Sequence, residues 1–426
     1  MFYSIVRPIV AIALKIYFTK IYFTNRDRIP MDKPLIMAIN HPSAFIEPCV
    51  CACYQPRRLY FLVRGNLFAK PIFKAMLNAL HMVPIFRASE GFGNLGKNDD
   101  TFKFCYEALK EKKTIMILPE GKTIQEKRLR PIKKGLARIA FGTYERYGDI
   151  DLEIVCIGAN FSQADKFRSF AMFDVSKPIK LRDYFELYKE NERQAITQLT
   201  KDVKDRLEAQ IVNIKNKEDE PLAENLFTIY RNNHPQSVFP ILSTNEIPVQ
   251  AERKIANTVT HLPQEEKGNW NTIVGKYFEK IKRLGIEDKG IVNLGFDNLK
   301  NTLLLILGFV PFLIGYIGNY LPPRIGQYFY DNKVKQLEFK APVGLGVSIG
   351  IYLIYFLFFM ILGYSQLGWI GIAIVLLVFF LGRFALIYRG HYQTWRAARN
   401  AGQLDANELN ELKNNRAQVV DLVKCV

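Results

Sequence analysis

A stretch without charged side chains, residues 341–382, constrains the fold of this chain more than any other feature. A helix needs about 20 predominantly apolar residues to cross a membrane, so the stretch can hold two such helices. Tyr364-Ser365-Gln366 offers a turn near its middle. We therefore expect a C-terminal transmembrane helical hairpin, with spans at about residues 343–363 and 367–388.

A second uncharged stretch, residues 301–323, contains Pro311 and ends in two prolines. It either spans the membrane or forms a re-entrant or interfacial segment at 302–321. Lys and Arg concentrate in cytoplasmic loops, and both the loop 324–340 and the tail 389–426 carry them close to the apolar stretches. A first segment that does not span keeps the loop, the tail and the preceding chain together on the cytoplasmic side. We therefore favour two spans and a cytoplasmic tail.

Residues 1–30 form an apolar, aromatic N-terminal segment that Arg7, Lys15 and Lys20 interrupt. The interruptions are too frequent for a spanning helix. The segment is expected to associate with the membrane as an interfacial helix, or to pack as a helix against the rest of the protein. The sequence leaves both alternatives open.

The charge balance of the whole chain favours an anionic partner. Lys and Arg outnumber Asp and Glu by 58 to 41, which gives a formal net charge of +17. Nucleic acid, a membrane surface and phosphorylated substrates all suit such a charge. The basic residues are dispersed and form no recognised nucleic-acid motif, so we expect no nucleic-acid partner. The five histidines are scattered, and we expect neither a metal site nor a bound organic cofactor.

Short apolar runs alternate with helical patterns across residues 31–216. This alternation is typical of an α/β fold with a largely parallel sheet flanked by helices. The following residues, 217–300, are expected to form a helical region that carries no recognisable chemistry. Strands are predicted at Leu35–Ile39, Leu59–Val63, Met82–Phe86, Thr114–Leu118, Leu152–Ile157 and Ala171–Val175, and helices at Thr101–Lys112, Lys134–Tyr147 and 190–216.

A histidine and a carboxylate stand where the first predicted strand, Leu35–Ile39, gives way to a helix. His41 is the side chain best suited to take a proton near neutral pH. Glu47 follows six residues later, within reach of one ring nitrogen. Such a contact would fix the tautomer and leave the other nitrogen to act as a general base. The pair brings no nucleophile of its own, which suits a reaction whose substrate supplies the hydroxyl.

Three further charged residues follow predicted strands, where ligands of parallel sheets bind. They are Arg64, Arg87 and Glu120. Glu120 begins Glu120-Gly121-Lys122, and a basic segment that includes Lys134 comes after it. Arginine presents a forked set of donors to phosphate, and glycine permits a close backbone approach to a ligand. These residues suit a site for a phosphorylated polyol, although an ordinary turn with a solvated basic face is the simpler explanation of the segment taken alone.

The order of these blocks resembles that of the glycerolipid acyltransferase family, the glycerol-3-phosphate and lysophosphatidate acyltransferases. The histidine and acid come first, then apolar-Pro-Ile-Phe-Arg, then Pro-Glu-Gly, then a late strand, over roughly residues 30–180. The resemblance implies a membrane-associated α/β domain that transfers a fatty acyl group from a thioester to a glycerol hydroxyl. It assigns the catalytic pair to His41 and Glu47. It assigns phosphate binding to Arg87 and the acceptor site to Glu120 and Gly121.

Two features depart from the usual pattern of that family. Five residues rather than four separate the histidine from its acid, and the acid is Glu47 where the longer-spaced branch normally has aspartate. Cys156 stands where the late strand usually has proline. The extra methylene of glutamate means that the contact with the ring must be aimed differently.

The resemblance further implies the reaction partners. His41 would deprotonate glycerol 3-phosphate or 1-acylglycerol 3-phosphate. From the residues themselves we add backbone donors at 42–44, which would stabilise the oxyanion. The weaker candidates for phosphate binding beside Arg87 are Arg64, Lys122, Arg130, Lys133 and Lys134. Acyl-CoA or acyl-ACP would be a co-substrate, so acyl carrier protein and membrane lipids are expected partners in phospholipid biosynthesis. A bacterial inner membrane is the favoured location. The alternatives are an acyltransferase for another lysolipid or an amine-bearing lipid, or a catalytically degenerate membrane scaffold.

Overall fold

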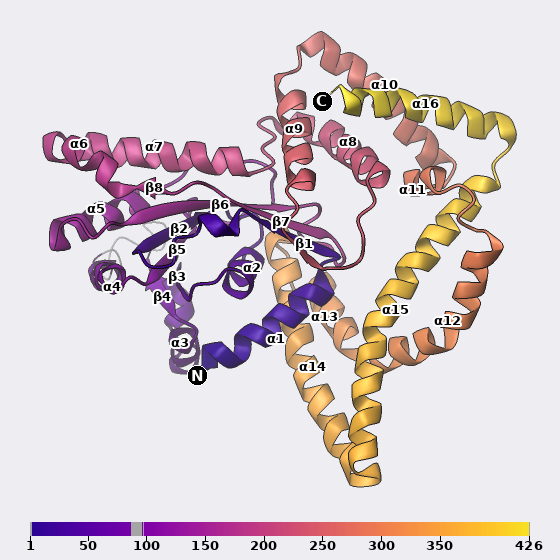
Figure 1. Ribbon diagram of the computed structural model, residues 1–426, viewed down its shortest axis with the longest axis horizontal. Helices are drawn as coiled ribbons and strands as arrows, with labels where there is room; N and C mark the ends of the chain where they lie inside the picture. The colour runs from indigo at the N-terminus through magenta and orange to yellow at the C-terminus, as the bar shows by residue number, and fades with distance from the viewer. Residues whose placement is uncertain (1, 87–95, 97, 426) are drawn as a thin grey trace. The chain divides into compact units, whose positions relative to one another are not determined.

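The computed structural model describes residues 2–86, 96 and 98–425 (Figure 1). Its internal contacts divide the chain into two compact units. The first unit contains residues 1–213, 238–249 and 335–342. The second contains residues 214–237, 250–334 and 343–426. The first unit holds the α/β domain and the second the helical and apolar regions.

A single mixed sheet forms the centre of the first unit, with the strand order β4-β3-β5-β2-β6-β7-β1-β9, and β8 pairs with β6. The strands from β4 to β6 run parallel to one another, as do β7, β1 and β9. The two blocks meet at the antiparallel pair of β6 and β7. The strands are β1 Lys20–Thr24, β2 Leu35–Ile39, β3 Leu59–Arg64, β4 Met82–Ile85, β5 Thr114–Ile117, β6 Glu153–Phe161, β7 Phe170–Val175, β8 Ile179–Lys180 and β9 Leu242–Ser243.

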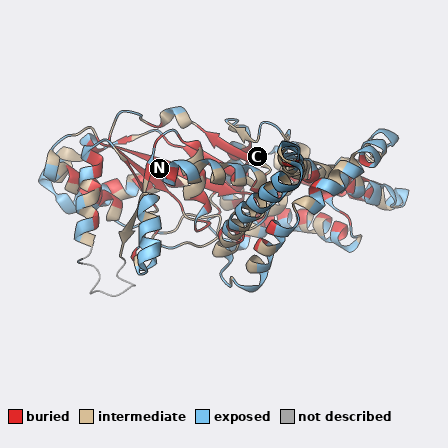
Figure 2. Ribbon diagram, turned by 90° about the horizontal axis from the view of Figure 1, so that it is seen from below, coloured by how far each residue is buried: buried red, intermediate tan, exposed pale blue. Residues whose placement is uncertain are grey.

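All six strands expected from the sequence are present, which confirms the α/β fold with a largely parallel sheet. β2 has the predicted bounds because its five residues are buried on both faces and therefore form one uninterrupted apolar run. β6 continues to Phe161, four residues past its predicted end, and is buried throughout. In Figure 2 the central strands of the sheet are accordingly drawn in the colour of buried residues, whereas β4 at its edge is intermediate.

Strand β1 was not expected, and it corrects the interpretation of residues 1–30 as one segment. Helix α1, Phe2–Tyr17, is followed directly by β1, which pairs with β7 inside the sheet. All five residues of β1 are buried, including Lys20. The N-terminal segment is therefore part of the α/β domain beyond its helix, and α1 itself packs against α2.

Helices cover the sheet on both faces (Figure 1). The helix α7 was expected from a stripe of apolar residues, and every member of that stripe is buried. Together with α4 and α5 it encloses a core that contains Leu109, Phe141 and Leu199. The helices of the first unit after α1 are α2 Ile46–Tyr54, α3 Pro71–Ala79, α4 Asn98–Lys110, α5 Gly135–Tyr147, α6 Phe185–Glu190 and α7 Glu192–Gln210.

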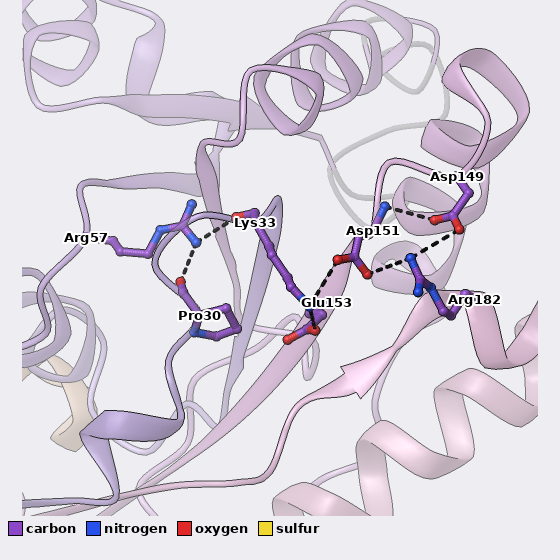
Figure 3. A network of polar contacts seen from close by, with 7 residues as sticks. All are labelled: Pro30, Lys33, Arg57, Asp149, Asp151, Glu153 and Arg182. Carbon is purple, nitrogen blue, oxygen red and sulfur yellow. Dashed lines mark hydrogen bonds and ion pairs between the residues drawn. The ribbon is translucent and has the colours of Figure 1, made fainter.

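A polar network fixes the amino ends of β2 and β6 (Figure 3). The Lys33 ammonium lies 2.5 Å from a Glu153 carboxylate oxygen and 3.0 Å from one of Asp151, which also binds Arg182 at 2.9 Å. The Arg57 guanidinium donates to the carbonyl oxygens of Pro30 and Lys33 at 2.6 and 2.7 Å. These bonds hold the edge of the sheet opposite to the carboxyl ends of the strands.

The helical region expected at residues 217–300 is interrupted by residues 238–249, which belong to the first unit and contain β9, a strand of the sheet. It comprises α8 Glu220–Asn233, α9 Ile247–His261, α10 Gln264–Arg283 and α11 Asp288–Val292, and the C-terminal helix α16, Ala406–Lys424, packs against α8 and α10. Asp288 links these helices. Its buried carboxylate accepts hydrogen bonds from Arg416 at 2.7 Å, from Asn232 at 2.7 Å and from the Tyr277 hydroxyl.

Three helices of the second unit are long and apolar enough to cross a membrane. They are α12 Leu299–Gly318, α14 Leu337–Leu367 and α15 Trp369–Gly402, joined in part by α13 Leu321–Asn332. The expected hairpin corresponds to α14 and α15, but its turn lies at Gly368, where the backbone has a φ of 57°, and not at residues 364–366. The stretch expected at 302–321 as a re-entrant or interfacial segment is an unbroken helix over most of its length.

The apolar helices of the second unit contact one another through small residues and one amide. A Cβ on Gly315 of α12 would lie 2.2 Å from the Leu381 carbonyl oxygen of α15, so the two backbones touch there. The Asn319 amide donates to the Val378 carbonyl oxygen at 2.8 Å and accepts from the Tyr352 hydroxyl of α14. A satisfied amide of this kind ties α12, α14 and α15 together in an apolar environment.

Candidate active site

The turn after β2 is fixed by a side chain that binds a neighbouring strand. The Asn40 amide donates to the Ala159 carbonyl oxygen at 2.9 Å, and its oxygen accepts from the Ala159 N–H at 2.6 Å. This pair of bonds continues the ladder between β2 and β6 by one residue. His41 therefore leaves the sheet at a defined point on its carboxyl edge, where ligands of parallel sheets bind.

His41 and Glu47 form the contact that the sequence indicated. Nδ1 of His41 lies 2.8 Å from Oε1 of Glu47, which stands in the first turn of α2. The same oxygen accepts the Ser43 N–H at 2.9 Å. The carboxyl group of Glu47 is fully buried, whereas 11% of the His41 side chain is exposed. A carboxylate in this position would hold a proton on Nδ1 and leave Nε2 free to accept another.

The position of Ser43 corrects one expectation about the oxyanion. Backbone donors at 42–44 were expected to stabilise it, but the Ser43 N–H is used by Glu47. Pro42 has no N–H to offer. Of the three residues, Ala44 alone keeps a backbone N–H outside this contact.

Glu120 lies beside His41 because β5 and β2 are neighbours in the sheet. Ala38 pairs with Ile117, and the register continued by three residues brings His41 opposite Glu120. One carboxylate oxygen of Glu120 accepts the His41 N–H at 2.7 Å, and the other accepts the Arg130 N–H at 3.3 Å. Glu120 therefore joins the turn that carries His41 to the basic segment 122–134.

Burial gives Glu120 an unusual affinity for its proton. The residue is only 6% exposed. Removal from water disfavours the charged form and raises the pKa of Glu120 to about 7, although the backbone N–H groups of His41 and Arg130 act in the opposite direction. The carboxyl group is therefore divided between its two protonation states near neutral pH.

The basic segment 122–134 is held in place over the carboxyl edge by its own contacts. The Lys127 ammonium donates to the Ser162 carbonyl oxygen at 3.1 Å, and Gln125 donates to Asp165 at 2.9 Å. Gly121 begins the segment with a φ of 71°, a conformation that favours glycine. Lys122 next to it is exposed.

The structure does not bring every predicted site residue together. Arg64 ends β3, which is separated from β2 by β5, so it lies two strands away from His41 on the same edge. The Lys134 ammonium donates to Thr197 of α7 at 2.9 Å. Arg87 lies outside the described residues. The cluster that the described chain does assemble consists of His41, Glu47, Glu120 and Gly121.

Sequence reasoning missed two features of this cluster. They are the pair of bonds between the Asn40 side chain and the Ala159 backbone, and the hydrogen bond that the His41 N–H donates to Glu120. An asparagine at the carboxyl end of a predicted strand is a recognisable signal, because its side chain can continue a backbone ladder. The Glu120 bond depends on which strands are neighbours, and the order of strands cannot be read from local pattern.

Residues 20–158 match the family model described as Acyltransferase. A stretch of 107 residues, 25% of this chain, is 31% identical to glycerol-3-phosphate O-acyltransferase 2 of Saccharomyces cerevisiae and covers 14% of that protein. A stretch of 76 residues, 18% of this chain, is 34% identical to glycerol-3-phosphate O-acyltransferase 1 of the same yeast and covers 10% of it.

Residues 20–158 are therefore similar to an acyltransferase domain of the glycerolipid type. The matched residues, 20–158, contain His41, Glu47, Glu120 and Gly121 and begin at β1, the strand that sequence reasoning placed outside the domain. Among solved structures, the 1-acyl-sn-glycerophosphate acyltransferase PlsC of Thermotoga maritima aligns with a TM-score of 0.33 and 16% identity, over 48% of this chain and 78% of that one. The likeness to this family rests on the sequence matches, which span about a seventh or less of the yeast proteins.

Proposed function

We propose that this chain is a membrane-bound O-acyltransferase of phospholipid biosynthesis that acylates glycerol 3-phosphate or 1-acylglycerol 3-phosphate. The observation that carries the proposal is the contact of 2.8 Å between Nδ1 of His41 and the buried carboxylate of Glu47. This contact, on the carboxyl edge of a family domain, provides a general base and no nucleophile. Both named yeast relatives are glycerol-3-phosphate O-acyltransferases.

In the proposed reaction His41 moves a single proton. Its Nε2 takes the proton of the acceptor hydroxyl while the hydroxyl oxygen attacks the carbonyl carbon of the thioester. The carbon–sulfur bond then breaks, and the imidazolium returns the proton to the leaving thiolate. Glu47 stabilises the imidazolium between the two steps because its carboxylate lies against Nδ1. General-base assistance of this kind typically contributes about 10²–10⁴-fold to the rate.

The acceptor is proposed to bind over the basic segment 122–134, with Arg87 and Lys122 as phosphate ligands. Arg64, on the same edge of the sheet, and Lys134 are the more distant candidates. Gly121 allows a close approach to its backbone, whereas Glu120 positions the turn that carries His41. Acyl-CoA or acyl-ACP supplies the acyl group, and no further cofactor takes part in the proposed steps.

The three apolar helices support a location in the membrane, where the lipid product resides. Basic residues of the loop after α13 and of the end of α15 favour the cytoplasmic side for the catalytic domain. A bacterial inner membrane remains our proposal for the compartment. The number of spans, two or three, depends on whether α12 crosses.

Acyl transfer by the purified full-length chain tests this function. Labelled glycerol 3-phosphate and lysophosphatidate are each offered with a long-chain acyl-CoA and with an acyl carrier thioester. We expect transfer to one acceptor and a loss of about 10²–10⁴-fold in kcat for His41→Ala and for Glu47→Gln. His261→Ala, which changes an exposed histidine of α9, is the matched control and should retain the rate.

Equal background transfer by wild type and His41→Ala with all four substrate pairs would exclude the proposed reaction. The remaining hypotheses would then be an acyltransferase for another lysolipid or an amine-bearing lipid, or a membrane scaffold without activity.

A further inference from the structure

Helix α3 carries an apolar face that nothing in the described protein covers. Every residue of this helix is exposed or only half-buried. Ile72 is 75% exposed, Phe73 48% and Met76 42%, and Leu67 in the preceding turn is 39% exposed. Positions 72, 73 and 76 lie on one side of a helix, so these side chains form a continuous surface, which we call the α3 face.

The α3 face is held rigidly even though it is bare. At its start, a Cβ on Gly65 would lie 2.2 Å from the Phe86 ring, so the turn before the helix fits closely over that ring. At its end, the His81 ring stacks between two tyrosines, with ring centroids 4.9 Å from Tyr3 and 4.8 Å from Tyr60. The packing at both ends thus fixes which side of α3 faces outward.

The charge around the α3 face has one sign. Lys70 and Lys74 are exposed beside it, and no acidic residue occurs between Gly65 and His81. The stack between Tyr3 and His81 brings the first turn of α1 next to the end of α3. In α1 the side chains of Phe2 and Ile5 are also exposed, at 43% and 53%. An apolar surface flanked by lysines complements the surface of an anionic bilayer.

We propose that the α3 face seats on an anionic lipid bilayer, with Ile72, Phe73 and Met76 in the interfacial layer. Lys70 and Lys74 then meet the lipid headgroups. The α3 face belongs to the first unit, whereas α12, α15 and all of α14 after Pro342 belong to the second. The proposal rests on the membrane location proposed above and is independent of the acyl-transfer chemistry.

The place of α3 after strand β3 indicates what this membrane contact does. β3, which leads into the helix, runs parallel to β5, and β5 runs parallel to β2. The α3 face and His41 therefore both follow strand ends on the same edge of the sheet. Seating α3 in the interface brings that edge to the bilayer surface, where acyl chains and lysolipids reside.

Fluorescence quenching in vesicles tests the proposal on the full-length chain. The chain is reconstituted into vesicles of phosphatidylcholine and phosphatidylglycerol, with and without bromine on the acyl chains. Phe73→Trp reports on the α3 face, and the fluorescence of Trp270, Trp369 and Trp395 in the wild type is subtracted. Lys201→Trp, on the exposed side of α7, is the matched control.

We expect brominated lipid to remove more than half of the fluorescence that Phe73→Trp adds, and aqueous iodide to leave it unchanged. The control should respond to iodide and not to bromine. Changing both Lys70 and Lys74 to glutamine should reduce the quenching by brominated lipid. Matching circular dichroism spectra show that each variant is folded.

Two results would overturn the proposal. Quenching of Phe73→Trp by iodide alone would place the α3 face in water. Protection from both quenchers, together with a crosslink between copies, would show that a second copy of the chain covers it. Because no step of this experiment requires turnover, a reconstituted protein without acyltransferase activity would still show whether the α3 face contacts lipid.

Discussion

Replacing Glu120 by glutamine separates the two properties that the structure gives this residue. The wild-type carboxylate accepts one N–H at each oxygen, from His41 at 2.7 Å and from Arg130 at 3.3 Å. Glutamine has nearly the same shape, but one of its ends is a donor and would face an N–H. A buried donor left without an acceptor costs about 1–3 kcal/mol. Glutamine also removes the titration of the site.

The titration sets how the stability difference depends on pH. Burial raises the pKa of Glu120 from 4.5 to about 7 in the folded protein. At 1.36 kcal/mol per pKa unit, this rise corresponds to about 3 kcal/mol. The folded state binds this proton more tightly than the unfolded chain does. The contribution to stability is therefore fully present below a pH of about 4.5 and is lost as the pH rises through about 7.

Thermal unfolding of the full-length protein in detergent micelles measures the effect. Near pH 5 the wild type should have a higher Tm than Glu120→Gln. This difference in Tm should decrease by roughly 6–12 °C between pH 5 and pH 8, which is the shift expected for about 3 kcal/mol. Glu186→Gln, at an exposed carboxylate of α6 paired with Lys189, is the control and should change Tm little at either pH.

Infrared difference spectra of wild type and Glu120→Gln test the cause directly. The absorption of a protonated carboxyl group should disappear with a midpoint near pH 7. A midpoint near the ordinary value of 4.5 would refute the argument that burial controls this residue. So would a gap in Tm that does not change with pH.

Two further predictions concern packing and buried charge. Gly158→Ala should lower the unfolding free energy by about 1–3 kcal/mol, because the added Cβ would lie 2.1 Å from the Gln210 backbone oxygen. Gly268→Ala is the control, because the space around Gly268 is open and the added Cβ should change the unfolding free energy little. Equal Tm values for the two variants would contradict this prediction. Asp288→Asn should cost about 3–5 kcal/mol, because Arg416 would keep a buried charge without its counter-ion. Limited proteolysis should then cut α16 earlier than in wild type, and an unchanged rate would count against the role of Asp288.

The sequence predicted those parts of the fold that depend on local pattern. β2 is buried on both faces, so its apolar run has sharp limits. α7 is amphipathic, so its buried stripe was visible. The sequence did not predict strand β1, because β1 follows the apolar helix α1 without a break in composition. Its first residue is also a lysine, Lys20, which is buried. The membrane turn was placed too early because its polar residues, 364–366, continue the helix as far as Leu367.

In the candidate site, too, the sequence predicted the contacts that depend on local pattern and missed those that depend on the order of strands. His41 lies in the turn after β2 and Glu47 in the first turn of the helix that follows, so their contact depends on local geometry alone. The bond between Glu120 and the His41 backbone joins residues 79 positions apart and exists only because β5 lies next to β2. The expected oxyanion donors at 42–44 are reduced to the Ala44 N–H by a local contact, because the Ser43 N–H donates to Glu47 and Pro42 has no N–H.

The antiparallel contact between β6 and β7 gives one sheet two carboxyl edges that point in opposite directions. On the second of these, β1 and β7 end beside each other, and the chain fills the space with its own polar groups. The Asp174 carboxylate accepts from Thr24 at 2.6 Å and from Asn25 at 2.7 Å, and Arg28 donates to the Val175 carbonyl oxygen at 2.9 Å. The protein's own side chains thus occupy this second carboxyl edge, whereas His41, Glu47 and Glu120 stand at the first.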